Sequence, residues 1–76
     1  MVNVELLKNE MKELGTTQTI LAEKCGVTRQ TIANWLDDPD LISVNNARII
    51  ADALRITDKE KIFAIFFAPD VEFSST

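Results

Sequence analysis

Apolar residues recur along the chain at steps of three and four positions, which is the spacing that places them on one face of an α-helix. In the first segment the apolar positions are Val4, Leu7, Met11 and Leu14, and charged residues lie between them. We therefore predict an amphipathic helix over about residues 3–14. Gly15 follows it directly and is a natural end for a helix, because glycine adopts the left-handed conformation that closes the last turn.

Four further helices are predicted downstream, each preceded by a residue whose hydroxyl oxygen can accept a hydrogen bond from the first backbone N–H groups. These N-cap residues are Thr17, Thr28, Ser43 and Thr57. Thr57 is followed three positions later by Glu60, which completes a capping box at the start of the fifth helix. The pattern is therefore that of an all-α protein with five short helices.

The second and third helices have the residue types that a helix-turn-helix requires around the turn between them. Gly26 supplies the positive φ of a tight turn without steric cost. The small side chain of Ala22 lets the two helices cross closely. The wedge between the helices would be filled by five apolar side chains, namely Leu21, Cys25, Val27, Ile32 and Trp35.

The face of the third helix opposite this wedge is polar. By the helical period its outward positions are Thr28, Arg29, Gln30, Thr31, Ala33 and Asn34. Arginine pairs with guanine, glutamine and asparagine pair with adenine, and threonine or alanine offers a methyl group to thymine, so these side chains suit the major groove of DNA. Gln18, with Thr17 or Thr19, lies at the N-terminus of the second helix, where backbone N–H groups and the helix dipole favour a phosphate.

At these residues the sequence resembles a known family. Thr17–Leu36, TQTILAEKCGVTRQTIANWL, is similar to the helix-turn-helix of the Cro and phage-repressor proteins, the Xre-like family, and the five-helix layout covers about residues 3–67. The resemblance implies the lambda-repressor-like fold and a sequence-specific regulator of transcription, a Cro-like repressor of phage or prophage type. Its partner would be double-stranded DNA with a palindromic operator, read through the third helix of each copy.

The resemblance also implies roles for individual residues. The DNA-binding set would be Thr17, Gln18, Thr28, Arg29, Gln30, Thr31 and Asn34. In this set Gln18 clamps a phosphate and can touch a base. Arg29, Gln30 and Asn34 read the major groove, while Thr28 and Thr31 anchor the DNA backbone.

The sequence departs from the family pattern at three places. Leu36 and Asp38 stand near the positions where the family commonly has an acidic residue followed by glycine. The stretch Asp37–Asp40 is acidic, whereas relatives often carry a basic or amide residue there, and the proline within it predicts a loop. Arg55 replaces the glycine that usually closes the fourth helix, so we expect that turn to take a different form.

The formal charge of −4 over 76 residues opposes association with DNA, but the charge is unevenly spread. Residues 16–36 carry a charge of about +1, whereas residues 37–40 carry −3. Because the local field at the docking face governs association and one copy can neutralise few phosphates, we expect modest affinity and a requirement for more than one copy. Three lysines are interpreted as a solvated helix surface: Lys8, Lys12 and Lys24.

Residues 62–68 are apolar on every side of a helix, and such a helix must be covered on every side. One side can cover the core, which leaves the other side for a partner. We predict a homodimer that forms through Phe63, Phe66 and Phe67. The alternative is that Val71 and Phe73, in the short tail over residues 69–76, fold back and cover this side.

The composition excludes several kinds of chemistry. Histidine is absent and Cys25 is the one cysteine, so we expect no catalytic site, no metal site, no cofactor and no enzymatic activity. A single cysteine fits a reducing compartment, and the sequence has neither an apolar run of membrane-spanning length nor a signal-peptide pattern. We therefore predict a cytoplasmic protein without membrane association, with one helix-turn-helix domain over residues 1–76 and its core over about 3–67.

A second class of function stays open. On the same scaffold, a protein-interaction module such as an antirepressor or an antitoxin would bind a protein in place of DNA. The acidic surface and the apolar fifth helix favour this alternative. Selection of a defined palindrome from randomised duplexes would decide for the regulator.

Overall fold

The computed structural model describes residues 2–67, which form seven helical segments. In chain order these are α1 (Val4–Glu13), α2 (Gln18–Cys25), α3 (Arg29–Asp37), the 3₁₀ turn η1 (Pro39–Leu41), α4 (Val44–Ala53), α5 (Lys59–Ile62) and its π-helical continuation η2 (Phe63–Phe67). Residues 2–67 contain no β-strand, so the predicted all-α class with five helices is confirmed. The expectations for Val71, Phe73 and the tail over residues 69–76 lie outside the described residues.

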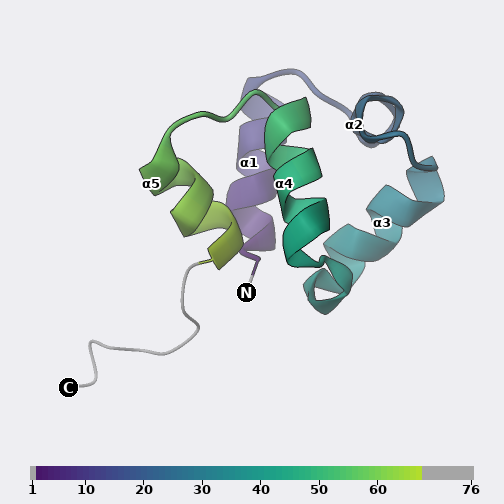
Figure 1. Cartoon of the computed structure of the whole chain (residues 1–76). Helices are drawn as coiled ribbons and strands as arrows, with labels where there is room; N and C mark the ends of the chain where they lie inside the picture. Colours follow the sequence, from purple (N-terminus) through teal and green to yellow (C-terminus); the bar gives the residue numbers. More distant parts are fainter. Residues whose placement is uncertain (1, 68–76) are drawn as a thin grey trace.

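α1 and α4 lie at the centre of the molecule, with α5 on one side of them and α2 and α3 on the other (Figure 1). One hydrophobic core connects these elements. Its most deeply buried large side chains come one from each of α1, α2, α3, α4 and η2, namely Leu7, Leu21, Ile32, Ile50 and Phe66. No helix within the described range has the length and apolar character that a bilayer crossing requires.

α2 and α3 pack against each other through the predicted wedge. Its buried and half-buried side chains are Leu21, Ala22, Cys25, Val27, Ile32 and Trp35. Between the helices Gly26 has a φ of +74°, and the N–H of Val27 bonds to the carbonyl of Ala22 at 3.0 Å. A Cβ on Gly26 would meet no atom within 4 Å, so the backbone conformation, and not a lack of space, requires glycine here. The predicted helix-turn-helix is confirmed.

The predicted N-caps are confirmed at three helices, where a side-chain oxygen accepts a backbone N–H at 3.0 or 3.1 Å: Thr17, Thr28 and Ser43. At the fifth helix the predicted capping box of Thr57 and Glu60 is wrong. The N-cap is Asp58, whose carboxylate accepts the N–H of Glu60 at 2.9 Å. α5 begins at Lys59, so Glu60 is its second residue and not the third, which a capping box requires.

Arg55 closes α4 in the left-handed conformation, with a φ of +57°. The N–H of Ile56 bonds to the carbonyl of Ala51 at 3.0 Å, and the N–H of Arg55 bonds to the carbonyl of Asp52 at 3.0 Å. The same pair of bonds closes α2 at Gly26. The expectation of a different turn is therefore wrong. Both chain neighbours of Arg55 are buried, and their packing holds the backbone in this turn although Arg55 carries a Cβ.

The predicted loop after α3 contains one turn of 3₁₀ helix, η1. Asp38 caps this turn by accepting the N–H of Asp40 at 3.3 Å. Pro39 occupies the first position, where its missing N–H costs no hydrogen bond. All three aspartates are exposed, and Asp38 alone among them has a local structural role as the cap of η1.

η2 lies against α1, close to the beginning of the chain. A π-helix pairs each N–H with the carbonyl five residues earlier, so carbonyls near its end lack a helical partner. The carbonyl of Ile65 accepts the N–H of Asn3 at 2.6 Å. In α5, Lys61 Nζ lies 3.3 Å from a carboxylate oxygen of Glu10 in α1. These two contacts tie the first helix to the last.

Arg55 is strained, because in the left-handed conformation its Cβ crowds the following carbonyl at a cost of about 1–2 kcal/mol. Arg55→Gly removes the strain but gives the unfolded chain more freedom, so we expect the free energy of unfolding to rise by about 0.5–1 kcal/mol. Equilibrium denaturation in urea measures the change. Arg55→Ala is the control, since it removes the charge and keeps the Cβ. An equal gain in both variants would show that the charge, and not the strain, is responsible.

Candidate nucleic-acid interface

α3 presents one polar side to solvent, opposite the buried side chains of Ile32 and Trp35. Thr28 caps the helix, so that the first polar residues stand in its first turn. The exposed side chains of α3 are Arg29, Gln30 and Asn34, with Asp37 at its last position, and Thr31 and Ala33 are half-buried beside them. The structure thus brings the three side chains that were predicted to read bases onto the exposed side of one helix.

Thr28 and Thr31 bond to each other at the start of α3. Their hydroxyl oxygens lie 2.9 Å apart, and the Thr28 oxygen also accepts the N–H of Thr31 at 3.1 Å. One of the two hydroxyl hydrogens is used between them, so the other remains free to be donated. The pair can therefore give one hydrogen bond to a phosphate oxygen without loss of the cap.

Gln30 and Asn34 are joined across the next turn of α3. Gln30 Nε2 donates to Asn34 Oδ1 at 3.0 Å, and both side chains are exposed. This hydrogen bond orders two flexible side chains in the free protein. Their remaining donors and acceptors stay open to solvent.

The N-terminus of α2 lies next to this side of α3. Thr17 caps α2 with its hydroxyl oxygen, which accepts the N–H of Ile20 at 3.1 Å, and its hydroxyl hydrogen remains available. Gln18 is half-buried and lines a hollow of about 330 Å³ together with Gln30 and Asn34. The structure therefore gathers predicted site residues of α2 and α3 around one hollow.

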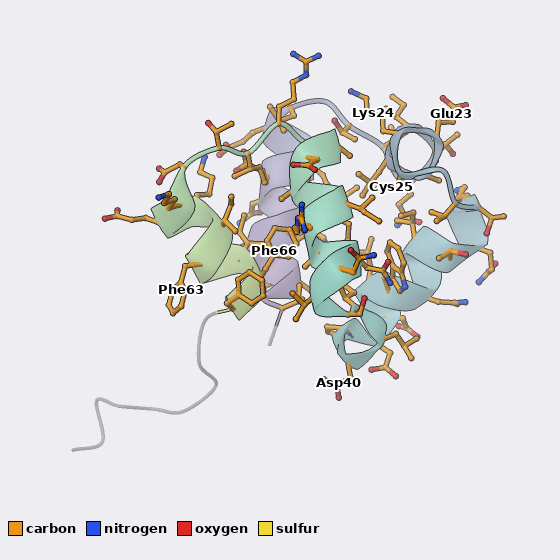
Figure 2. The ribbon with its side chains drawn as sticks, viewed as in Figure 1. Glu23, Lys24, Cys25, Asp40, Phe63 and Phe66 are labelled. Atoms are coloured by element: carbon orange, nitrogen blue, oxygen red, sulfur yellow. The ribbon has the colours of Figure 1, made fainter. Side chains whose placement is uncertain are left out.

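Two lysines of α1 also reach this place. Lys8 lines the same hollow, and Lys8, Lys12 and Thr17 line an adjoining one. Both lysines are exposed, as expected for a helix surface, but their position beside Gln18 adds two cations to the site. Sequence reasoning missed this because the helical period reports that a position faces outward and not which other helix lies beside it. Lys24 lies at the opposite end of α2 (Figure 2).

Among the residues that the structure describes, none forms an ion pair with the cations at this site. Within residues 2–67 the one salt bridge joins Lys61 to Glu10, between α5 and α1. The guanidinium of Arg29 and the two lysines of α1 are therefore available to a phosphate or a base. Asp37, by contrast, ends α3 and lines the hollow, where its carboxylate opposes an incoming phosphate.

Cys25 is half-buried on the side of α2 that faces α4 (Figure 2). Burial raises the pKa of the Cys25 thiol, so the thiol stays protonated at neutral pH and is a poor nucleophile. Across the part of the chain that the structure describes, no group of acidic or thiol side chains is arranged to hold a metal ion. The chemistry that this surface offers is hydrogen bonding and charge.

The three phenylalanines that were predicted to form a dimer surface have different environments. Phe63 is 55% exposed and Phe67 is 39% exposed, whereas Phe66 is 2% exposed and belongs to the core. Figure 2 shows Phe63 pointing away from the central helices and Phe66 between η2 and these helices. The assignment of Phe66 to a partner surface is therefore wrong, because its side chain is already covered by its own chain. Three other large apolar residues are at least half exposed, namely Leu14, Leu41 and Val44.

A model of the helix-turn-helix family matches residues 7–61, which run from α1 into α5 and include all of α2 and α3. No curated protein and no solved structure matches the chain significantly. The matched range covers more than two thirds of the 76 residues, and the helical order is that of the lambda-repressor-like fold. The chain therefore belongs to the Cro and Xre-like helix-turn-helix family of DNA-binding proteins.

Proposed function

We propose that this protein is a Cro-like repressor of transcription that binds a palindromic operator as a homodimer and reads each half-site with α3. The observation that carries the proposal is the exposed set of Arg29, Gln30 and Asn34 on a helix whose other side is packed into the core. The major groove of B-DNA admits an α-helix, and its base edges match side chains of these types.

In this proposal, base reading and phosphate binding fall to different residues. Arg29 donates two hydrogen bonds to a guanine, and the amide of Gln30 beside it on α3 pairs with adenine. The phosphates are bound around the N-termini of α2 and α3 by Lys8, Lys12, Thr17, Gln18 and the Thr28–Thr31 pair. Phosphate contacts fix the orientation of α3 and carry no sequence information.

A dimer follows from the small positive charge that each copy brings to DNA. Affinity for DNA rises with the number of phosphates that are neutralised, and one copy offers few cations at α2 and α3. Two copies double these contacts and place their recognition helices about 34 Å apart, in successive major grooves. Phe63 and Phe67, exposed on η2, form the proposed contact between the copies.

A protein-interaction module, such as an antirepressor or an antitoxin, is the second candidate. The observation that favours it is a hollow of about 460 Å³ between α1 and α5, on the other side of the molecule from α3 (Figure 1). Carboxylates from four residues outnumber its one cation, Lys61, which is paired with the first of them: Glu10, Glu13, Asp58 and Glu60. A surface of this kind suits a basic segment of a protein.

Selection from randomised DNA duplexes, followed by gel shift at a fixed salt concentration, separates the two functions. A regulator enriches one palindromic sequence and shifts it in preference to a scrambled duplex of equal length. An interaction module enriches no sequence, and any residual binding is independent of sequence and falls steeply with salt.

Arg29→Ala is expected to cost roughly 1–3 kcal/mol of binding free energy and to relax preference at one base pair, because it removes a bidentate contact with guanine. Lys8→Ala should weaken binding to all sequences about equally and lower the slope of log affinity against log salt by about 0.9. Fluorescence anisotropy at several salt concentrations measures both. Lys59→Ala removes the same charge from α5 and should leave the slope unchanged. If Arg29→Ala keeps the wild-type preference, α3 is not the reader.

Phe63→Glu is expected to give a folded monomer that binds DNA more weakly, because it places a charge in the proposed contact while the side chain is exposed in a single copy. Sedimentation equilibrium and gel shift on the selected palindrome measure these effects. Leu14→Glu, at a similarly exposed apolar position directly after α1, is the control and should remain a dimer. A wild-type protein that sediments as a monomer both alone and on DNA would contradict the dimer.

Asp37→Asn with Asp40→Asn is expected to raise affinity without a change in the preferred site, because carboxylates repel phosphates within a Debye length of roughly 8–10 Å. The gain should fade at high salt, where ions screen the carboxylates. Asp38 is left unchanged because it caps η1. The control is Asp52→Asn with Glu60→Gln, which removes two exposed charges from α4 and α5 and should give a smaller gain. Equal gains would mean that net charge, and not the acidic loop, sets affinity.

A further inference from the structure

The hydrogen bond between Gln30 and Asn34 changes how these two side chains can act on DNA. Gln30 Nε2 donates to Asn34 Oδ1 at 3.0 Å, and both residues are exposed on the side of α3 that enters the major groove in the proposed function. Among the residues that the structure describes, neither side chain has a second hydrogen-bond partner. The two amides are therefore oriented by each other.

This bond decides which edge of the Gln30 amide is free. A primary amide has one N–H on the same side as its carbonyl oxygen and one on the opposite side. The opposite N–H can be donated to Asn34, which leaves the oxygen and the other N–H next to each other on the outward edge. An acceptor beside a donor is what the major-groove edge of adenine requires, because its N6 amino group donates and its N7 accepts.

Asn34 is left in a different state. Its Oδ1 accepts from Gln30, so one of the two lone pairs of that oxygen is occupied, while the other lone pair and the Nδ2 donors remain. An asparagine pairs with adenine through its oxygen and nitrogen together. Reading a second adenine would require the same oxygen to accept another hydrogen bond beside that from Gln30, so Asn34 is better suited to hold Gln30 in place.

Ala33 can contact the thymine of the same A·T base pair. It stands three positions after Gln30, on the same side of α3, and lines the hollow that Gln30 and Asn34 also line. An alanine methyl group fits against the C5-methyl group of thymine, which faces the major groove in the same base pair as the N6 and N7 atoms of adenine. The three residues together match both members of one A·T pair.

We propose that Gln30, held in place by Asn34, reads one A·T base pair as a single unit, with Ala33 against the thymine methyl group. Asn34 is a positioning residue in this unit and makes no base contact of its own. The inference rests on the proposed function, because it needs α3 in the major groove. It goes further by naming the base pair and the residue that makes its recognition possible.

Base-preference profiles on the selected operator test the unit. Gln30→Ala should lower the preference for A·T at one position of the operator by about tenfold or more. Asn34→Ala should lower the preference at the same position. The double variant should be no less selective there than Gln30→Ala alone, because the two changes remove one interaction. Arg29→Ala is the control and should lower the base preference at a different position of the operator.

Asn34→Asp separates positioning from direct reading. Its carboxylate accepts from Gln30 but cannot donate to a base, so the A·T preference should be kept while the added charge lowers overall affinity at low salt. In the free protein, nitrogen-edited NMR reports the hydrogen bond without DNA. The side-chain amide resonances of Gln30 should shift in Asn34→Ala and stay in place in Arg29→Ala.

If Gln30→Ala and Asn34→Ala relax the base preference at two different base pairs, and their effects add in the double variant, the unit is overturned. The proposed function would still stand. Loss of the A·T preference in Asn34→Asp, as complete as in Asn34→Ala, would overturn it as well. A wild-type protein that selects no sequence at all would overturn the proposed function and the unit together.

Discussion

The burial of Ile32 and Trp35 against α2 and the core is the interaction on which the rest of the structure depends. It fixes one side of α3, so that the opposite side, with Arg29 and Gln30, must face solvent. Truncation of a core side chain of this size costs about 2–5 kcal/mol, which is a large share of the stability of a small domain. The arrangement of the polar surface therefore depends on the packing beneath it more than on contacts within it.

The hydroxyl groups at the proposed interface cap the helices and, in the proposed function, also bind DNA phosphates. Thr17 and Thr28 accept the backbone N–H groups that begin α2 and α3, and caps of this kind contribute about 1 kcal/mol each. The caps use the hydroxyl oxygens, so hydrogens remain to be donated at the helix ends where the dipole is positive. If the proposed function holds, a substitution at either threonine alters the stability of the domain and its affinity for DNA together.

The helix-turn-helix could be predicted from the sequence because its signals are local: a glycine at the turn, a small residue at the crossing and a helical period with two distinct sides. The errors concern choices that tertiary packing makes. Thr57 and Asp58 can both cap a helix, and the local sequence does not show which of them does so; in the structure it is Asp58. Residues 62–68 are apolar on all sides, so their period could not separate the exposed Phe63 from the buried Phe66. The lysines of α1 join the site only through the folding of the chain.

The contact between Asn3 and Ile65, with the ion pair of Lys61 and Glu10 beside it, closes the described chain into a ring. Loosening the first described residues uncovers η2, and loosening η2 uncovers α1. Neither segment can therefore fray without the other. The two terminal helices therefore open and close as one cooperative unit. α2 and α3 lie between these two elements in the chain, so the surface that is proposed to meet DNA is the part that motion of α1 and η2 reaches last.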